Sequence, residues 1–174
     1  MRLFVALELP EELLDALAET SAALRDCVRG RYVAPDSFHV TIAFLGEVEG
    51  SRVPALTEAL SLACQSHAPI PVTLGELGCF GKRSSAILWQ AVDGGEALSR
   101  LARDVRGSLR KAGFPFDEKA FVSHATLMRA ADLSRGSLPM PTSAKGMAET
   151  VTLFSSDLSS TRPRYAPLER FALA

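Results

Sequence analysis

Residues 39–42 read His-Val-Thr-Ile, and residues 124–127 read His-Ala-Thr-Leu, so the two stretches share the pattern His-x-Thr-apolar. Each copy lies in a mostly apolar run, over residues 38–45 and 121–128, and such runs favour a β-strand. Alternate residues of a strand face the same side, so each histidine is expected beside its threonine. The sequence therefore predicts two strands that each present one imidazole and one hydroxyl.

The repetition of this pattern is hard to attribute to accident. Two of the three histidines are followed two residues later by one of the nine threonines, which chance would produce in about one case in a hundred. The alternative is two unrelated, half-buried polar pairs, since threonine is common in strands. In each half, however, a long helical pattern ends at a glycine, Gly30 or Gly113, and the motif follows about ten residues later. This internal repeat favours two like halves that bring both motifs to one cleft.

Composition and charge are those of an ordinary globular protein. The chain has 174 residues, 47% of them hydrophobic, which suffices for a buried core without a disulfide or metal. We expect one domain over residues 1–174 and no contact with a membrane, because no run approaches the roughly 18 apolar residues of a membrane span. The opening run is too short and too early charged for a signal peptide, and three cysteines without CxxC spacing fit the cytoplasm. A net charge of −1 argues against coating of long nucleic acid and leaves a small ligand or a chain end as partner.

Hydrophobic periodicity places the remaining elements. Helices are predicted where apolar residues recur at helical spacing, over residues 10–30, 53–67 and 96–112. Strands are predicted over residues 1–8, 70–78, 85–92, 149–155 and 165–173, with a short further strand at 114–116. Residues 132–145 read as a polar connection.

Three other features have ordinary structural interpretations. His67 ends a helical pattern and is interpreted as a structural or surface residue. Trp89 is interpreted as a core residue. Arginines recur along the third helix at positions 100, 103, 106 and 110, which indicates a solvated face. The alternative is that these arginines form a row of positive charges that binds the phosphates of a substrate.

Paired imidazoles and hydroxyls suit the cleavage of a phosphate ester. A free imidazole has a pKa near 6.5, so at neutral pH one histidine can accept a proton while the other donates one. Threonine hydroxyls can donate hydrogen bonds to the non-bridging phosphate oxygens. The chain contains no HExxH, P-loop, GxSxG or carboxylate-rich metal motif, so no metal and no cofactor is expected. A metal site built from both histidines and a distant aspartate is the weaker alternative.

The two motifs and their surroundings resemble a known family. Residues 37–48 and 121–129 resemble the two signatures of the two-histidine (2H) phosphoesterases, in particular the RNA 2′,3′-cyclic phosphodiesterases, also called 2′-5′ RNA ligases. Residues 2–7 resemble the opening strand of that family, and residues 151–156 with Tyr165 and 171–173 resemble its closing hairpin. The resemblance covers nearly the whole chain.

The resemblance implies a fold, a reaction and a set of site residues. The fold is α+β and bilobal, with pseudo-twofold symmetry and two antiparallel sheets flanked by helices around a central cleft. The reaction is metal-independent hydrolysis of a terminal RNA 2′,3′-cyclic phosphate to a 2′-phosphate, with a reversible ligase activity on tRNA halves. The implied site consists of catalytic histidines (His39, His124), hydroxyls for phosphate oxygens (Thr41, Thr126), a positive charge (Arg129) and a nucleoside pocket (Phe4 or Phe44).

The position of Arg129 affects both the pocket and the roles of the two histidines. Strict alternation places Arg129 on the face opposite His124, so its role requires a β-bulge or a strand end. Phe44 stands at the equivalent position after His39, so only His124 is expected to feel a nearby positive charge. That charge would lower the pKa of His124 and favour it as the base, with His39 as the acid.

The sequence is also compatible with two other functions. A related 2H enzyme could act on a small cyclic nucleotide or an ADP-ribose cyclic phosphate, and the near-neutral charge suits such a substrate. A non-catalytic module that binds RNA ends is the alternative from another class. We expect a monomer whose partners are RNA ends or small nucleotides with a 2′,3′-cyclic phosphate.

Overall fold

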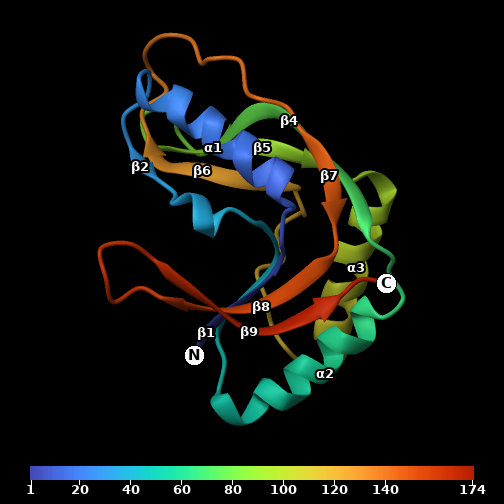
Figure 1. The fold of residues 1–174 in the computed structure, drawn as a ribbon. Helices are drawn as coiled ribbons and strands as arrows, with labels where there is room; N and C mark the ends of the chain where they lie inside the picture. Colours follow the sequence, from blue (N-terminus) through green and yellow to red (C-terminus); the bar gives the residue numbers. More distant parts are fainter.

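One curled antiparallel sheet and three helices make up the fold in a computed structural model, which describes residues 1–174 (Figure 1). The helices are α1 (Glu11–Arg25), α2 (Val53–Cys64) and α3 (Gly95–Lys111). The strands are β1 (Arg2–Leu7), β2 (Arg31–Tyr32), β3 (Val40–Glu47), β4 (Ile70–Phe80), β5 (Ala86–Asp93), β6 (His124–Ala131), β7 (Lys145–Ala148), β8 (Thr150–Asp157) and β9 (Arg164–Ala172). The predicted α+β class is confirmed.

The sheet consists of two antiparallel halves that meet at the motif strands. The strand order is β7-β4-β5-β6-β3-β1-β8-β9, and the short β2 pairs with β6. Between β3 and β6 a single residue pair, Val40 with Ala125, joins the halves. Each of these residues follows a motif histidine, so the seam of the sheet lies where the two motifs meet. The predicted bilobal arrangement is present, but the two expected sheets are joined into one through this pair.

Helices cover both halves of the sheet. In Figure 1, α1 lies across the half that contains β4, β5 and β6, while α2 and α3 pack together beside the other half. Leucines at helical spacing enter the core: Leu13 and Leu17 of α1, Leu60 of α2 and Leu101 of α3 are fully buried. Their side chains belong to one contiguous cluster of 41 buried residues that extends through both halves. None of the three helices has the length and apolar character that crossing a bilayer requires.

The structure differs from the prediction at several short segments. The helices α1 and α2 end at Arg25 and Cys64, earlier than expected, and the two-residue strand β2 was not predicted. Residues 145–148 form the edge strand β7 instead of ending a connection, and their sequence Lys-Gly-Met-Ala lacks the alternation of a typical strand. Residues 114–116 form no strand. Phe114 instead caps α3, because its N–H bonds to the carbonyl of Leu109 and its buried ring lies under the Arg52 guanidinium.

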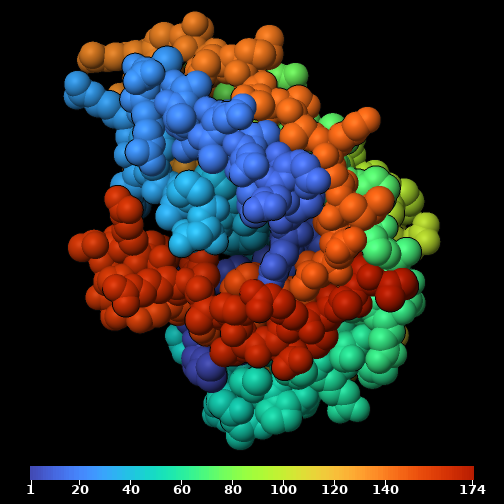
Figure 2. All heavy atoms as spheres, in the orientation of Figure 1, coloured from blue at the N-terminus to red at the C-terminus, as the bar shows by residue number.

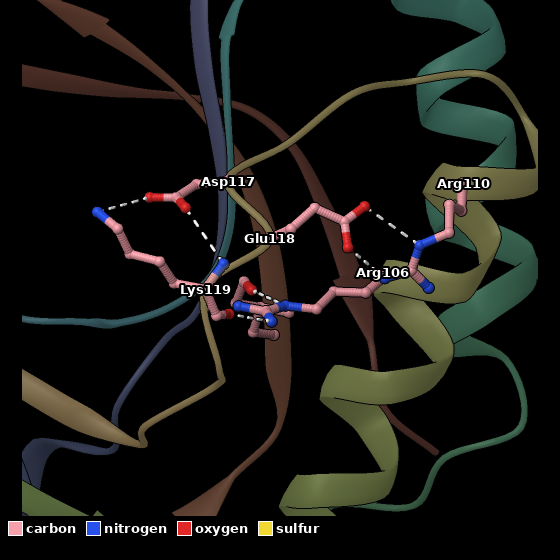
Figure 3. Close-up of polar contacts among 6 residues, drawn as sticks. Arg106, Arg110, Asp117, Glu118 and Lys119 are labelled. Carbon is pink, nitrogen blue, oxygen red and sulfur yellow. Dashed lines mark hydrogen bonds and ion pairs between the residues drawn. The ribbon is translucent and has the colours of Figure 1, made fainter.

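The arginines of α3 hold the segment that leads to the second motif. Arg106 Nε donates to the carbonyl oxygen of Ile42 at 2.9 Å, and its Nη1 donates to the carbonyl oxygen of Lys119 at 2.8 Å (Figure 3). Arg110 binds both carboxylate oxygens of Glu118 at 3.3 and 3.0 Å. The solvated-face interpretation therefore fails for Arg106, which bonds to two backbone carbonyls, while the other three arginines of the stripe are exposed.

Candidate active site

Both His-x-Thr motifs open onto one pocket. It has a volume of about 30 Å³, and its eight lining residues are Val33, Ser37, His39, Thr41, His124, Thr126, Arg129 and Tyr165. The pocket lies between the antiparallel neighbours β3 and β6. A space of this size admits a few water-sized groups, such as the oxygens of one phosphate, but no nucleoside.

A one-residue bulge follows the first motif threonine. Thr41 pairs with Ala6 of β1, and Ala43 pairs with Val5, so Ile42 is the extra residue. An extra residue reverses the alternation of the side chains that follow it. Phe44, three residues after Thr41, therefore returns to the face of the sheet that carries the motif.

The second motif has the equivalent bulge. Thr126 pairs with Trp89 of β5, and Met128 pairs with Leu88, so Leu127 is the extra residue. Arg129 consequently faces the pocket, which strict alternation would have prevented. The bulge that the sequence required for Arg129 is present, and it occupies the same position relative to each motif.

The backbone determines which nitrogen of each motif histidine carries the proton. Nδ1 of His39 lies 2.7 Å from the carbonyl oxygen of Ser37, and Nδ1 of His124 lies 2.6 Å from that of Val122. A carbonyl oxygen only accepts, so in both rings Nδ1 is the donor. Nε2 is then the nitrogen that can gain or lose a proton. In His39 it lies 2.9 Å from Oγ1 of Thr41.

Burial makes both histidines poor proton acceptors from solvent. Burial lowers the pKa of His39 from 6.5 to about 4. The positive Arg129 and His124 lower this pKa by smaller amounts, whereas the hydrogen bond to Ser37 raises it. Burial also lowers the pKa of His124, assisted by Arg129. The expectation that Arg129 would distinguish the two rings was wrong, because it acts on both and burial is the larger cause. His39 is the ring that stays neutral to lower pH.

Aromatic side chains enclose each imidazole. Phe4 and Tyr165 pack against His39, with ring centroids 5.0 and 5.6 Å away. On the other side of the pocket, Phe80 and Trp89 pack against His124 at 5.0 and 5.5 Å. These rings exclude water from the imidazoles, which is the cause of their lowered pKa values.

Phe4 and Phe44 are not among the residues that line the pocket, and their expected place in a nucleoside site stays a prediction. Phe4 is only 4% exposed, because His39 and Phe154 pack against it. The ring of Phe44 is covered by the Arg2 guanidinium, whose carbon lies 4.5 Å from the ring centroid. The Phe4 ring is thus enclosed, whereas Phe44 is half-buried with Arg2 over its ring.

Two aromatic residues around the pocket were misassigned or missed from the sequence. Trp89 was expected in the core but contacts His124. Its strand neighbours Leu88 and Gln90 are fully buried, so strand alternation turns Trp89 to the opposite face. Gly78 leaves room for the indole, since a Cβ there would lie 2.3 Å from Trp89. Tyr165 reaches the pocket from the β8–β9 hairpin, and no local pattern indicated that its ring would meet a motif histidine.

His67 lies away from the pocket and has a structural partner. Its Nε2 is 2.9 Å from a carboxylate oxygen of Asp104, which connects the segment after α2 to α3. The eight residues that line the pocket include no carboxylate. Nowhere does the chain bring together three or more histidine, cysteine, aspartate or glutamate side chains in a metal-binding arrangement.

Comparison with known proteins identifies the family. An RNA 2′,3′-cyclic phosphodiesterase of Escherichia coli is 33% identical to the chain over 175 residues, which cover 99% of this chain and 96% of that protein. The family LigT like Phosphoesterase matches residues 7–89. The chain belongs to the LigT-like phosphoesterases of the 2H superfamily. Membership in this family makes it a phosphoesterase, and therefore a hydrolase.

Solved phosphoesterase structures share the fold over the whole chain. A crystal structure from Thermus thermophilus superimposes with a TM-score of 0.87 at 28% identity, covering 99% of this chain and 98% of that one. Escherichia coli LigT complexed with 3′-AMP gives 0.79 at 30% identity, covering 99% and 97%. A relative from Geobacillus stearothermophilus, also an RNA 2′,3′-cyclic phosphodiesterase, is 30% identical over 98% of this chain, and the match spans 56% of its length.

Proposed function

We propose that this phosphoesterase is an RNA 2′,3′-cyclic phosphodiesterase that converts a terminal 2′,3′-cyclic phosphate into a 2′-phosphate. The observation that carries the proposal is the common pocket of the two motifs, in which each histidine is held by a backbone carbonyl at Nδ1. The activity for which the relatives are named supports the same substrate.

In the proposed reaction the two histidines exchange one proton each with the substrate. A water oxygen attacks phosphorus while its proton passes to Nε2 of the base, and the bond from phosphorus to O3′ breaks. The acid donates its Nε2 proton to O3′, so the ring opens and the phosphate stays on O2′. We assign the base to His39, because deep burial keeps it neutral, and the acid to His124.

The remaining pocket residues stabilise the charge of the phosphate. The hydroxyls of Thr41 and Thr126 donate hydrogen bonds to the non-bridging oxygens, and Arg129 supplies a positive charge. These groups account for charge stabilisation without a metal ion, so the proposal includes metal-independent catalysis.

The same pair of histidines also accounts for a ligase activity. If the 5′-hydroxyl of a second RNA end replaces water, the base takes the hydroxyl proton and the product is a 2′-5′ phosphodiester. The substrates include tRNA halves. Because one chain supplies both motifs, a monomer contains the complete pocket, and we propose a cytoplasmic monomer.

A second substrate class is a small cyclic nucleotide or an ADP-ribose cyclic phosphate. It is favoured by the size of the pocket, which holds a phosphate group whatever is attached to it. A non-catalytic RNA-end-binding module is disfavoured, because both histidines are present and both have Nδ1 held.

Product analysis tests the proposal. The purified protein is incubated with cytidine 2′,3′-cyclic phosphate, with a short RNA that ends in the same group, and with ADP-ribose cyclic phosphate. From the two cytidine-terminated substrates we expect 2′-phosphate products, separated by chromatography from the 3′ isomers, and none from a variant in which His39 and His124 are both replaced by alanine. A 3′-phosphate would show the opposite direction of opening. Absence of turnover of all three substrates would contradict the proposed function.

A further inference from the structure

A larger groove continues from the catalytic pocket and is strongly basic. It has a volume of about 500 Å³, and four arginines and two tyrosines dominate its lining: Arg25, Arg31, Arg129, Arg162, Tyr32 and Tyr165. None of its thirteen lining residues is an aspartate or a glutamate. The groove and the catalytic pocket share four residues, including Arg129 and Tyr165, so the two spaces are continuous.

Two segments far apart in the sequence form the walls of this arginine groove. One wall is the stretch from the end of α1 through β2, and the other is the tip of the β8–β9 hairpin at residues 161–163. Figures 1 and 2 show the red hairpin beside this blue stretch, on the same side of the molecule. Arg31 pairs with Arg129 in the β2–β6 ladder, so the row of cations begins at the catalytic pocket and extends away from it.

The positive charge of the groove is not neutralised by the protein. None of its four arginines takes part in a salt bridge, although six ion pairs occur elsewhere in a chain whose net charge is −1. Like charges held close together repel one another, and an anionic ligand relieves that repulsion. Four separate cations along a groove match several phosphates of a chain better than one isolated anion.

An aromatic ring lies among these cations. The Arg25 guanidinium carbon is 5.0 Å from the ring centroid of Tyr32, and the Tyr32 hydroxyl donates to the carbonyl oxygen of Val28 at 2.7 Å, which holds the ring in place. Basic grooves with aromatic or guanidinium surfaces on which bases stack are typical of proteins that bind single-stranded nucleic acid. The catalytic pocket is too small for a nucleoside, so the rest of the substrate must lie outside it.

We propose that the arginine groove binds the RNA strand on the 5′ side of the cyclic phosphate, including at least one nucleotide before the terminal one. This proposal rests on the proposed function, and it selects RNA ends over small cyclic nucleotides as the preferred substrates. Arg31 and Arg162 contact backbone phosphates, while Tyr32 with Arg25 provides a surface for a base.

The test compares a tetranucleotide and a mononucleotide that carry the same terminal cytidine 2′,3′-cyclic phosphate. In the wild type we expect a higher kcat/KM for the tetranucleotide. In the double variant Arg31→Ala with Arg162→Ala, the kcat/KM for the tetranucleotide divided by that for the mononucleotide should fall by on the order of tenfold. The slope of log KM for the tetranucleotide against log salt concentration should decrease by about 1 to 1.5, because two phosphate contacts are lost.

A matched control removes the same charge elsewhere. Arg100 and Arg103 are exposed on α3, and replacing both with alanine should leave the substrate ratio and the salt slope at wild-type values. Circular dichroism and thermal unfolding check that all variants fold, and Arg31→Lys with Arg162→Lys should retain most of the preference. Equal losses for both substrates in the groove variant, or equal ratios in groove and control variants, would overturn the proposal.

Failure of the proposed function gives a different result. If the wild type hydrolyses neither substrate, the groove is tested by fluorescence anisotropy with a labelled tetranucleotide that ends in a 3′-phosphate. Binding that is lost in the groove variant and kept in the control supports the groove independently of catalysis. Binding that is equal in all three proteins, or absent from the wild type, overturns it.

Discussion

Arg106 donates a hydrogen bond to the backbone carbonyl oxygen of Ile42, at 2.9 Å, and Ile42 is the extra residue of the bulge that follows Thr41. A bulge leaves a backbone group of its strand without a ladder partner, and a buried group of this kind requires one. Through its second bond, to Lys119, the same guanidinium holds the segment that leads to His124. Arg106 thus connects the surroundings of both motifs.

Replacing Arg106 with alanine should lower the free energy of unfolding by about 2 kcal/mol, because the carbonyls of Ile42 and Lys119 lose a charged donor. We also expect a lower kcat/KM, since the bulge positions Thr41. Urea denaturation and steady-state kinetics measure the two effects. Arg110→Ala is the control, because its ion pair with Glu118 is exposed and should contribute little. Equal effects of the two variants would show that the bond to Ile42 has no special role.

Alanine at His39 or at His124 should each reduce kcat by about 10²- to 10⁴-fold, which is the usual effect of removing a general acid or base. The fold should persist, as circular dichroism can verify. His67→Ala serves as the comparison, since His67 follows α2, away from the pocket, and bonds to Asp104. A correctly folded His39 or His124 variant that keeps more than about a tenth of the wild-type kcat would show that the replaced imidazole transfers no proton.

The dependence of kcat/KM on pH should be bell-shaped with its maximum on the acid side of pH 6.5. A base must be neutral, so activity falls as pH drops through the pKa of His39, at about 4. An acid must be protonated, so activity falls as pH rises through the lowered pKa of His124. The two limbs belong to the coupled pair. The pH dependence of kcat should have its maximum at a higher pH than that of kcat/KM, because the negative charge of a bound phosphate raises the pKa values of the imidazoles. An alkaline limb of kcat/KM above pH 6.5 would contradict the dominance of burial.

Stability should also depend on pH through His39. Its pKa is about 4 in the folded protein and near 6.5 when unfolded, so between these values the unfolded chain binds more protons. Stability is therefore lost as pH falls from 6.5 to 4, by about 3 kcal/mol for this group. Urea unfolding of the wild type and of His39→Gln across this range isolates the contribution, because glutamine does not titrate. Parallel pH dependence in the two proteins would refute the assignment.

Exhaustive dialysis against EDTA should leave kcat and KM unchanged, because acid–base catalysis by imidazoles requires no metal ion. The assay is repeated after adding Zn²⁺ or Mn²⁺ to the dialysed protein. Activity that disappears on chelation and returns with either ion would rule out the metal-independent reaction.

Much of the fold could be predicted from periodicity and turn residues. The three helices and most strands follow from patterns such as Leu13 and Leu17 after Pro10, which bury one helical face wherever the helix packs. The edge strand β7 could not be predicted, because its four residues acquire strand geometry only from pairing with β4.

The sequence alone indicated the family through its two motifs. It also predicted that His39 lies beside Thr41 and His124 beside Thr126, because strand alternation is a local property that a short pattern encodes. Only the tertiary structure decided that Arg129 reaches the pocket, that both imidazoles lose proton affinity, and that Arg162 of the hairpin faces Arg31 across a groove. Bulges depend on the register with a neighbouring strand, burial depends on side chains from several elements, and the groove depends on segments far apart in the chain. Such relationships arise from packing, which no local pattern specifies.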